Sequence, residues 1–292
     1  GSAGRKLNSL EVHDLMCMIG QIVVVGGVRR SALISLSNLT DRRMREAKMG
    51  AWYEKEQHPY RSLANNSVAY TERPDSATFM EEWVSLVKSK SGERGIFNRV
   101  ASQAQAGKWG RRDTTLSYGT NPCSEIILRD KQFCNLTEVV VRSDDTEDTL
   151  STKVILATIL GTIQSTLIDF QFLSEDWKKN TEEERLLGVS LTGIMDCKLT
   201  SNPDPKLLER LRDAARRTNQ EYSERLNIPV STSISCVKPS GTVSQLVDSA
   251  SGIHARHNAH YIRRVRIDKK DPVYQFLKDK GFPVEDEVNN PN

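Results

Sequence analysis

The sequence predicts an α/β fold, arranged as one large domain or as two smaller ones. At 292 residues the chain is long enough to bury a sizeable core. Stretches with apolar residues at helical spacing are followed along the chain by short β-like runs and glycine turns. The most apolar helical stretch, roughly 154–173, is interrupted by Gln164 and Asp169. It therefore predicts a buried core helix and not a membrane span.

Charge and cysteine usage narrow the class of protein further. The net charge of +3 comes from 41 basic and 38 acidic residues spread along the chain, which argues against a polyanion-binding surface. We therefore expect neither nucleic acid nor a membrane as a partner. Five cysteines without a Cys-x-x-Cys pair favour a reducing cytoplasm over a secreted disulfide framework. The start, Gly-Ser-Ala-Gly without a methionine, suggests a segment of something longer.

The first quarter of the chain predicts a helix followed by a strand. Apolar spacing indicates a helix over 10–25, with Asn8 or Ser9 as its cap and Glu11 in its first turn. After a glycine pair, 28–37 alternates like a strand. The adjacent Arg29 and Arg30 at its start fit either a nearby anion or a solvated charged edge.

The next segments alternate between helix, loop and strand. A charged helical pattern over 41–48 precedes a loop over 52–63 that Pro59 interrupts. A strand over 65–70 and a helix over 76–88 follow, and the chain then turns back over 92–97. The basic, glycine-bearing run 103–113 predicts a loop.

The stretch 117–140 predicts a hairpin loop that carries reactive groups. Asn121, Cys123 and Glu125 alternate within Asn-Pro-Cys-Ser-Glu, and an extended backbone would point all three the same way. Pro122 favours that geometry for the residue before it. Cys134 returns eleven positions after Cys123. The pattern places a thiol, an amide and a carboxylate on one face, with a second thiol on the other limb.

The second half of the chain is mostly helical before a final strand and turn. The run 182–197 predicts a helix end that meets a strand or turn, and 203–226 predicts an arginine-rich amphipathic helix with a solvated basic face. The segment 234–244 predicts a strand that ends in Lys-Pro-Ser-Gly-Thr before a helix. Such a turn either binds an anion or merely caps the helix.

The last segments carry weaker signals. His254, His257 and His260 lie three apart, but no cysteine or carboxylate accompanies them at ligand spacing, so we expect no metal site. The run 261–267 alternates arginine with apolar residues and predicts a strand. A helix and a polar end follow.

Several motifs, taken in order, resemble the catalytic subunit of ribonucleotide reductases. They are VVVGGVRRSALISL, NNSVAY, NPCSEI, FCNLTEV, LLGVSLTGIMD and VKPSGTVSQLVDSASGIH. The resemblance covers nearly the whole chain, and NPCSEI with FCNLTEV is its most specific part. It is strongest to the adenosylcobalamin-dependent, monomeric type that reduces ribonucleoside triphosphates.

This resemblance implies a fold and an activity. The fold would be part of the ten-stranded α/β barrel of ribonucleotide reductases and glycyl radical enzymes, with a finger loop inside it. Residues 1–292 would form one catalytic barrel domain that lacks the first strands and the tail. The activity would be the radical reduction of ribonucleotides to 2′-deoxyribonucleotides for DNA synthesis, with adenosylcobalamin as cofactor.

The resemblance also assigns roles to residues. Cys123 would carry the thiyl radical that abstracts the 3′ hydrogen of the ribose, and Glu125 would be the general base on the 3′ hydroxyl. Asn121 would bind the ribose hydroxyls, and Cys134 would be one half of the reducing dithiol. The residues that would cradle the substrate phosphates are Pro239, Ser240, Gly241, Thr242, Val243 and Ser244. An effector nucleotide would be read near Arg29, Arg30 and Arg61.

The implied partners are a ribonucleoside triphosphate, a deoxynucleotide effector and a thioredoxin-like reductant. One departure from the family is the second redox cysteine, which is expected on an early strand. Cys17, Cys197 and Cys236 do not match it and are interpreted as packing residues. The C-terminal cysteine pair of the family is also missing from the sequence. We therefore expect an internal piece that does not turn over alone.

Two other classes of function remain open on sequence grounds. The chain could be a non-catalytic nucleotide-binding or assembly piece of a split reductase, which an upstream cysteine in the gene would argue against. It could also be a Cys/His metal protein, which metal analysis would test.

Overall fold

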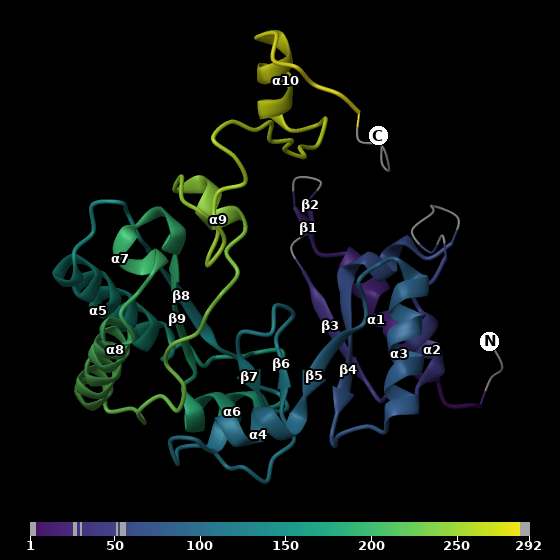
Figure 1. Cartoon of the computed structure of the whole chain (residues 1–292), viewed down its shortest axis with the longest axis horizontal. Helices are drawn as coiled ribbons and strands as arrows, with labels where there is room; N and C mark the ends of the chain where they lie inside the picture. Colours follow the sequence, from purple (N-terminus) through teal and green to yellow (C-terminus); the bar gives the residue numbers. More distant parts are fainter. Residues whose placement is uncertain (1–3, 26–27, 30, 51, 53–56, 287–292) are drawn as a thin grey trace. The chain divides into compact units, whose positions relative to one another are not determined.

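The computed structural model describes residues 4–25, 28–29, 31–50, 52 and 57–286 (Figure 1). These residues form helices and mostly parallel strands, which confirms the α/β class. The chain divides into two compact units, unit 1 with residues 1–100 and 262–292 and unit 2 with residues 101–261. In the part of the chain that the structure describes, every helix is too short or too polar to cross a membrane.

Unit 1 is built on a parallel sheet of three strands in the order β3-β4-β5. These are β3 (Leu33–Ser37), β4 (Ala64–Tyr70) and β5 (Gly95–Asn98). Leu33 is opposite Ala64, and Ser67 is opposite Gly95. Helix α2 (Arg42–Glu46) lies between β3 and β4 in the chain, and α3 (Ser76–Ser89) between β4 and β5. Two successive βαβ crossovers thus form the sheet.

Within the described residues, unit 1 has five further elements besides these strands and their two crossover helices. They are α1 (Ser9–Gln21), β1 (Val24–Val25), β2 (Val28–Arg29), the 3-10 helix Pro59–Leu63 and α10 (Pro272–Asp279). Of the two predicted caps of the first helix, Asn8 and Ser9, the structure uses Asn8, which forms a capping box with Glu11. The predicted strand 28–37 is two pieces, because β1 and β2 form an antiparallel ribbon before β3 begins.

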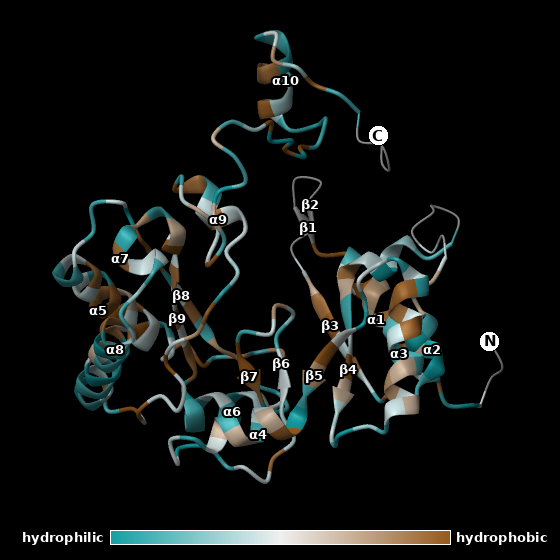
Figure 2. Ribbon diagram, in the orientation of Figure 1, coloured by the Kyte–Doolittle hydropathy of each residue, from teal (hydrophilic) through white to brown (hydrophobic). Residues whose placement is uncertain are grey.

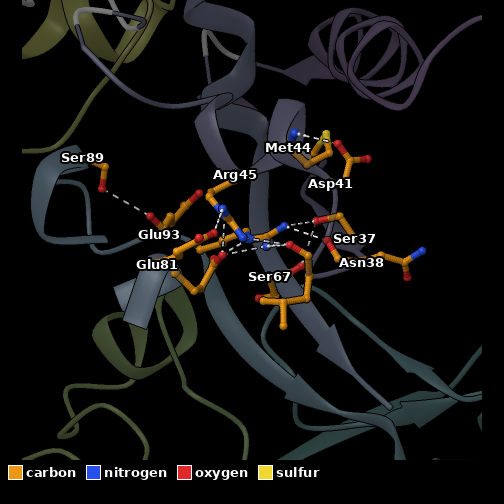
Figure 3. A network of polar contacts seen from close by, with 12 residues as sticks. Ser37, Asn38, Asp41, Met44, Arg45, Ser67, Glu81, Ser89 and Glu93 are labelled. Atoms are coloured by element: carbon orange, nitrogen blue, oxygen red, sulfur yellow. Dashed lines mark hydrogen bonds and ion pairs between the residues drawn. The ribbon is translucent and has the colours of Figure 1, made fainter. Parts of the chain in front are cut away.

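A buried ion-pair network joins the helices and strands of unit 1 (Figure 3). The Glu82 carboxylate accepts from Arg94 Nε at 2.6 Å and from Arg45 Nε at 2.8 Å. Arg94 also donates to Ser37 Oγ at 2.8 Å. Burial would raise the pKa of Glu82, but the two guanidinium groups lower it. This cluster ties α2 and α3 to the end of β3.

Unit 2 has a helical layer over a small parallel sheet. Its elements are α4 (Arg99–Gly107), β6 (Gly119–Thr120), β7 (Ile127–Leu128), β8 (Asn135–Val140), α5 (Glu147–Gln164), α6 (Glu175–Glu184), β9 (Leu187–Thr192), the 3-10 helix Ile194–Asp196, α7 (Lys198–Ser201), α8 (Pro205–Leu226) and α9 (Thr242–Leu246). Strand β8 pairs with β9 in parallel, and Ser235 bridges to Val189 on the other side of β9.

The core of unit 2 lies between this sheet and helices α5 and α8. Val139, Leu187 and Val189 from the strands pack there with Leu150 from α5 and Leu211 from α8. In Figure 2 parts of the α5 ribbon are coloured as hydrophobic, whereas the visible face of α8 is largely hydrophilic. Burial of this apolar face is what fixes the two helices on the sheet.

Three sequence predictions of secondary structure are wrong in unit 2 or at its edges. Residues 103–107 belong to helix α4, because alanine and glutamine there are good helix formers. Helix α5 ends at Gln164, well before the predicted end at 173. The run 261–267 forms no strand, since it pairs with no other strand among the described residues.

Candidate active site

The predicted hairpin exists, and a tight turn forms its tip. Strands β6 and β7 pair antiparallel, with Thr120 opposite Ile127. The Ser124 N–H donates to the Asn121 carbonyl at 2.9 Å, and Asn121 Oδ1 accepts the N–H of Ile126 at 3.1 Å. Ser124 has a φ of 65°, in the left-handed region. The Asn121 side chain thus stabilises the turn through this hydrogen bond.

This turn overturns the expectation of one extended row. Asn121, Cys123 and Glu125 do not share a face of a strand, because the backbone bends between them. Cys123 is exposed at the tip. The side chain of Glu125 has 0% exposed surface. The thiol and the carboxylate therefore occupy different surroundings in this structure.

Glu125 is held by a lysine from the second predicted stretch. Lys238 Nζ lies 2.8 Å from Glu125 Oε1, although 113 residues separate them in the chain. The other carboxylate oxygen, Oε2, is buried and has no hydrogen-bond partner among the described residues. Burial alone would lower the pKa of Lys238, but its bond to Glu125 raises it. The hairpin and the glycine turn are therefore adjacent.

The sheet presents a polar face on the side away from the core. Glu138 on β8 is opposite Ser190 on β9, and Cys236 follows the Val189–Ser235 bridge by one residue. Glu138 Oε1 and Ser190 Oγ are buried and have no hydrogen-bond partner in the described part of the chain. Buried polar atoms are rarely left unpaired, so this face is suited to a ligand with several hydroxyl groups.

The hairpin and the sheet converge over Gly188. A Cβ at this position would lie 2.3 Å from Leu136 Cδ2, 3.0 Å from Ile126 Cδ1 and 3.2 Å from Cys236 Sγ. Only glycine leaves room for these three side chains. The contact brings Cys236 and the base of the hairpin to one place.

Two thiols of the site are kept protonated. Burial, and then the charge of Glu125, raise the pKa of Cys134 to about 11. Burial, Glu125 and Cys134 raise the pKa of Cys236 to about 12. Such thiols are poor nucleophiles at neutral pH because the thiolate is scarce. Their S–H groups remain available for hydrogen transfer.

The predicted phosphate turn is an ordered loop that leads into α9. Ser240 Oγ accepts the N–H of Ser244 at 3.1 Å, and Ser244 Oγ donates to the Gly241 carbonyl at 2.7 Å. Gly241 is exposed, and a Cβ there would meet nothing within 4 Å. The first N–H groups of α9 have no acceptor within the helix. The turn is thus both capped and open to a ligand.

A second loop, which contains residues 250–252, packs against this turn. Thr192 Oγ1 donates to the Ala250 carbonyl at 3.1 Å and accepts from the Gly252 N–H at 2.9 Å. Asp196 Oδ2 accepts the N–H of Ala250 at 2.7 Å. Gly252 has a φ of 56°, and a Cβ there would lie 2.9 Å from the Lys238 carbonyl. Residues 250–252, which Thr192 and Asp196 hold in place, therefore lie close to the backbone of Lys238.

The residues predicted to read an effector lie in unit 1. Arg29 belongs to β2, and Arg30 lies outside the described residues. Arg61 is buried, with Nη2 at 2.6 Å from Asp14 Oδ2 and Nη1 donating to the Ala47 carbonyl at 2.6 Å. The guanidinium of Arg61 thus holds α1 against the 3-10 helix Pro59–Leu63.

Among the described residues, no group of three or more His, Cys, Asp and Glu side chains is placed to hold a metal ion. His254 is exposed, and its Nδ1 lies 3.2 Å from the Ser251 carbonyl. Cys17 and Cys197 are buried, as a packing role predicts.

Lys238 and Cys236 are the two site residues that the sequence reasoning missed. The sequence pattern gives Lys238 no role of its own within the turn and indicates a packing role for Cys236. The position of Lys238 directly before the turn was the available signal. The partner of each residue is far away in sequence, so local pattern could not reveal the contact.

Curated relatives match almost the whole chain. The adenosylcobalamin-dependent ribonucleoside-triphosphate reductase of Lactobacillus delbrueckii subsp. bulgaricus is 30% identical over 99% of this chain. The enzyme of the same name from Lactobacillus leichmannii is also 30% identical, and that of Lacticaseibacillus paracasei is 29% identical. The chain spans only 42% of the length of the first two and 41% of the third. No family model matches the chain.

Solved structures agree on the fold. A B12-dependent, class II ribonucleotide reductase superposes with a TM-score of 0.70 at 26% identity and covers 99% of this chain and 43% of its own. The class Id ribonucleotide reductase alpha subunit of Actinobacillus ureae gives a TM-score of 0.66 at 15% identity, over 98% of this chain and 58% of its own. The predicted fold, part of the reductase barrel, is thereby confirmed. In its sequence motifs, its relatives and its fold, the chain is similar to the adenosylcobalamin-dependent ribonucleotide reductases.

Proposed function

We propose that this chain carries the radical chemistry of ribonucleotide reduction, in which a ribonucleotide loses its 2′ hydroxyl and becomes a 2′-deoxyribonucleotide. The ion pair between Glu125 and Lys238 is the observation that supports this most directly. It joins the cysteine-bearing hairpin to the glycine turn. One substrate could therefore contact a thiol, a carboxylate and a phosphate-binding turn together.

Each residue of the hairpin has a proposed step. Cys123 loses its sulfur-bound hydrogen atom, and the resulting thiyl radical takes the 3′ hydrogen of the ribose. Glu125 accepts the proton of the 3′ hydroxyl. Asn121 binds ribose hydroxyls through its amide nitrogen, because its oxygen is used by the Ile126 N–H. Cys134 and a second thiol supply two electrons as they become a disulfide, and the 2′ hydroxyl leaves as water.

The turn Pro239–Ser244 is the proposed phosphate site, with its hydroxyl groups and first α9 N–H groups as donors. The proposed substrate is a ribonucleoside triphosphate. Glu125 is buried against Lys238. The substrate must therefore displace Lys238, or lengthen its contact with Glu125, before the carboxylate reaches a ribose. The phosphates of the substrate would draw the ammonium group towards the turn.

Adenosylcobalamin is the proposed cofactor. When bound, it supplies one-electron chemistry through homolysis of its cobalt–carbon bond. One feature of the structure is compatible with this cofactor as the source of the radical. The Cys123 thiol is exposed at the hairpin tip and is accessible to a group outside the chain. The unpaired polar atoms of the site belong to the sheet and the buried carboxylate, which fits them to substrate hydroxyls instead.

Further parts of the proposal rest on the family resemblance. Both units would contribute to one catalytic domain over 1–292. A deoxynucleotide effector would be read near Arg29, Arg30 and Arg61, where the structure shows only the packing role of Arg61. A thioredoxin-like protein would restore the dithiol. The predicted cytoplasmic location rests on the cysteine usage alone.

A single-turnover assay tests the proposed activity. The full-length protein is incubated with a ribonucleoside triphosphate, adenosylcobalamin and a dithiol reductant, and deoxynucleotide is quantified. We expect product that requires the cofactor and is abolished in Cys123→Ser, with a large loss in Glu125→Gln. Product formed equally well by Cys123→Ser would exclude the proposed radical carrier. Binding of substrate without any product in the wild type would favour a nucleotide-binding piece.

A further inference from the structure

Unit 2 contains a basic cavity whose residues differ from those of the proposed phosphate turn. Its volume is about 280 Å³, several times the roughly 30 Å³ that one water occupies in the liquid. It lies among the end of α4, the loop that follows it, helix α8 and segment 232–235. The cationic lining residues are Lys108, Arg111, Arg112, Arg212 and Arg216, and the hydroxyl-bearing ones are Thr232, Ser233 and Ser235.

The acids near this cavity do not balance its cations. Arg112 is neutralised by Glu184, with Nη2 at 2.8 Å from Oε2, and both side chains are buried. Glu125 is the acidic residue of the lining, and its carboxylate is already paired with Lys238. Neither carboxylate is therefore available to the other cations of the cavity.

The cations on α8 share one carboxylate and one aromatic ring. Arg212 and Arg216 both contact Asp213, at 3.2 Å and 3.9 Å. Their guanidinium groups also lie over the Trp109 ring, at 5.5 Å and 5.0 Å from its centre, and Lys108 Nζ is 5.3 Å from the same centre. The basic face of α8 is thus not merely solvated at this end, because it lines a concave site. Three positive charges around one ring repel one another.

Arg111 is the cation of the cavity that most clearly lacks a negatively charged partner. Its Nη1 donates to the Ser231 carbonyl at 2.6 Å, which fixes the plane of the guanidinium. Its Nε is buried and has no acceptor among the described residues. Burial, and then the charge of Arg216, lower the pKa of Arg111. A partly buried guanidinium without an anion is unfavourable, so the site is organised for one.

We propose that this cavity binds a phosphoryl anion, held by Arg111 and by Arg216 and Lys108 at its rim, with the hydroxyl groups of segment 232–235 as further donors. Phosphoryl oxygens match this lining because guanidinium groups and hydroxyl groups donate to them in several directions. The anion is either an inorganic phosphate species or the phosphate chain of a nucleotide. The cavity is separate from the turn Pro239–Ser244. The anion would therefore be bound in addition to the proposed substrate.

Titration calorimetry with the whole chain tests this site. The probes are tripolyphosphate and ATP, which carry the same phosphate chain. Arg111→Gln and Arg216→Gln remove cavity cations, and Arg217→Gln removes a neighbouring arginine of α8 that does not line the cavity. We expect each cavity variant to weaken tripolyphosphate binding about tenfold or more, and Arg217→Gln to change it less than about twofold.

The comparison of probes identifies the source of the anion. Equal affinity for both supports an inorganic polyphosphate or phosphate ligand, and tighter binding of ATP supports a nucleotide. A thermal melt without any anion should show Arg111→Gln at least as stable as the wild type, because an uncompensated charge is removed. Undetectable binding to the wild type would overturn the proposal. So would full binding by both cavity variants, or an equal loss in Arg217→Gln.

Discussion

Lys238 joins the hairpin to the glycine turn, because its ammonium group lies 2.8 Å from the buried carboxylate of Glu125. Glu125 has no other hydrogen-bond partner at Oε2 among the described residues. The pair therefore has two functions in this account. It keeps the proposed base at a defined position, and it places the start of the phosphate turn beside it.

Replacing Lys238 by methionine should destabilise the fold more than replacing it by arginine. The Glu125 carboxylate would stay buried without a cation, a loss of roughly 3 kcal/mol or more in such pairs. Lys238→Arg keeps the positive charge and should restore much of the lost free energy of unfolding. Urea unfolding of the three proteins measures the difference. Equal stability of wild type and Lys238→Met would show that the pair is not maintained in solution.

The same pair predicts a pH dependence. Because the pKa of Lys238 is raised in the folded state, its contribution to stability is complete below the unfolded lysine value of about 10.4 and is lost as pH rises through the folded value. The stability gap between wild type and Lys238→Met should be constant from about pH 6 to about pH 9. It should shrink only above about pH 10.5.

The thiols predict a graded reactivity. Cys123 is exposed, whereas the pKa values of Cys134 and Cys236 are raised to about 11 and about 12. At pH 8 less than roughly one in a hundred of these two half-buried thiols is ionised. Iodoacetamide followed by peptide mass spectrometry should modify Cys123 first by a wide margin. Alkylation of Cys134 at the rate of Cys123 would contradict the burial of the site.

Among the elements, strand β9 is the one on which the site depends, because Gly188 lets the hairpin reach the sheet. A Cβ at Gly188 would overlap Leu136 and crowd Ile126 and Cys236. Gly188→Ala should cost about 1–3 kcal/mol as an overpacked position and should also disturb the hairpin. Thermal or urea unfolding measures the loss of stability. Faster alkylation of Cys134 reports the disturbance of the hairpin.

Gly161 in α5 is the matched control for this substitution. A Cβ at Gly161 would meet Leu187 and Thr137 only at ordinary contact distances, from 3.5 Å. Gly161→Ala lies in a helix, where alanine is favoured over glycine by up to about 1 kcal/mol. We expect it to be neutral or stabilising. If both variants lost the same stability, crowding at Gly188 would not be the cause.

Local patterns predicted elements wherever one segment determines its own structure. The capping box of α1, the buried strand β4 and helix α8 follow from residue spacing within each segment. The hairpin tip was predicted as extended and is a turn, because the Asn121 side chain bonds the Ile126 N–H in competition with the strand. Run 261–267 had strand-like alternation but found no partner strand among the described residues.

At the scale of the whole molecule, the sequence motifs predicted the fold family and the stretches that meet at the site. The pairing of Glu125 with Lys238 and the approach of Cys236 over Gly188 could not be predicted, since both depend on the packing of the hairpin onto a sheet formed by distant segments. Unit 2 contains Cys123, Glu125, Cys134 and Lys238, so the proposed chemistry of the ribose lies within one compact unit.

Uptake of solvent deuterium by adenosylcobalamin is the sharpest test of Cys123 as the radical carrier. A thiol exchanges its hydrogen with D₂O, so a Cys123 that gives up and regains a hydrogen atom in the presence of the cofactor would carry deuterium into it. This step needs neither Cys134 nor a reductant. Mass spectrometry of recovered adenosylcobalamin should show deuterium with the wild type and with Cys134→Ser, and none with Cys123→Ser. Exchange that persists in Cys123→Ser, or that is absent from the wild type, would contradict the assignment of Cys123 as the radical carrier.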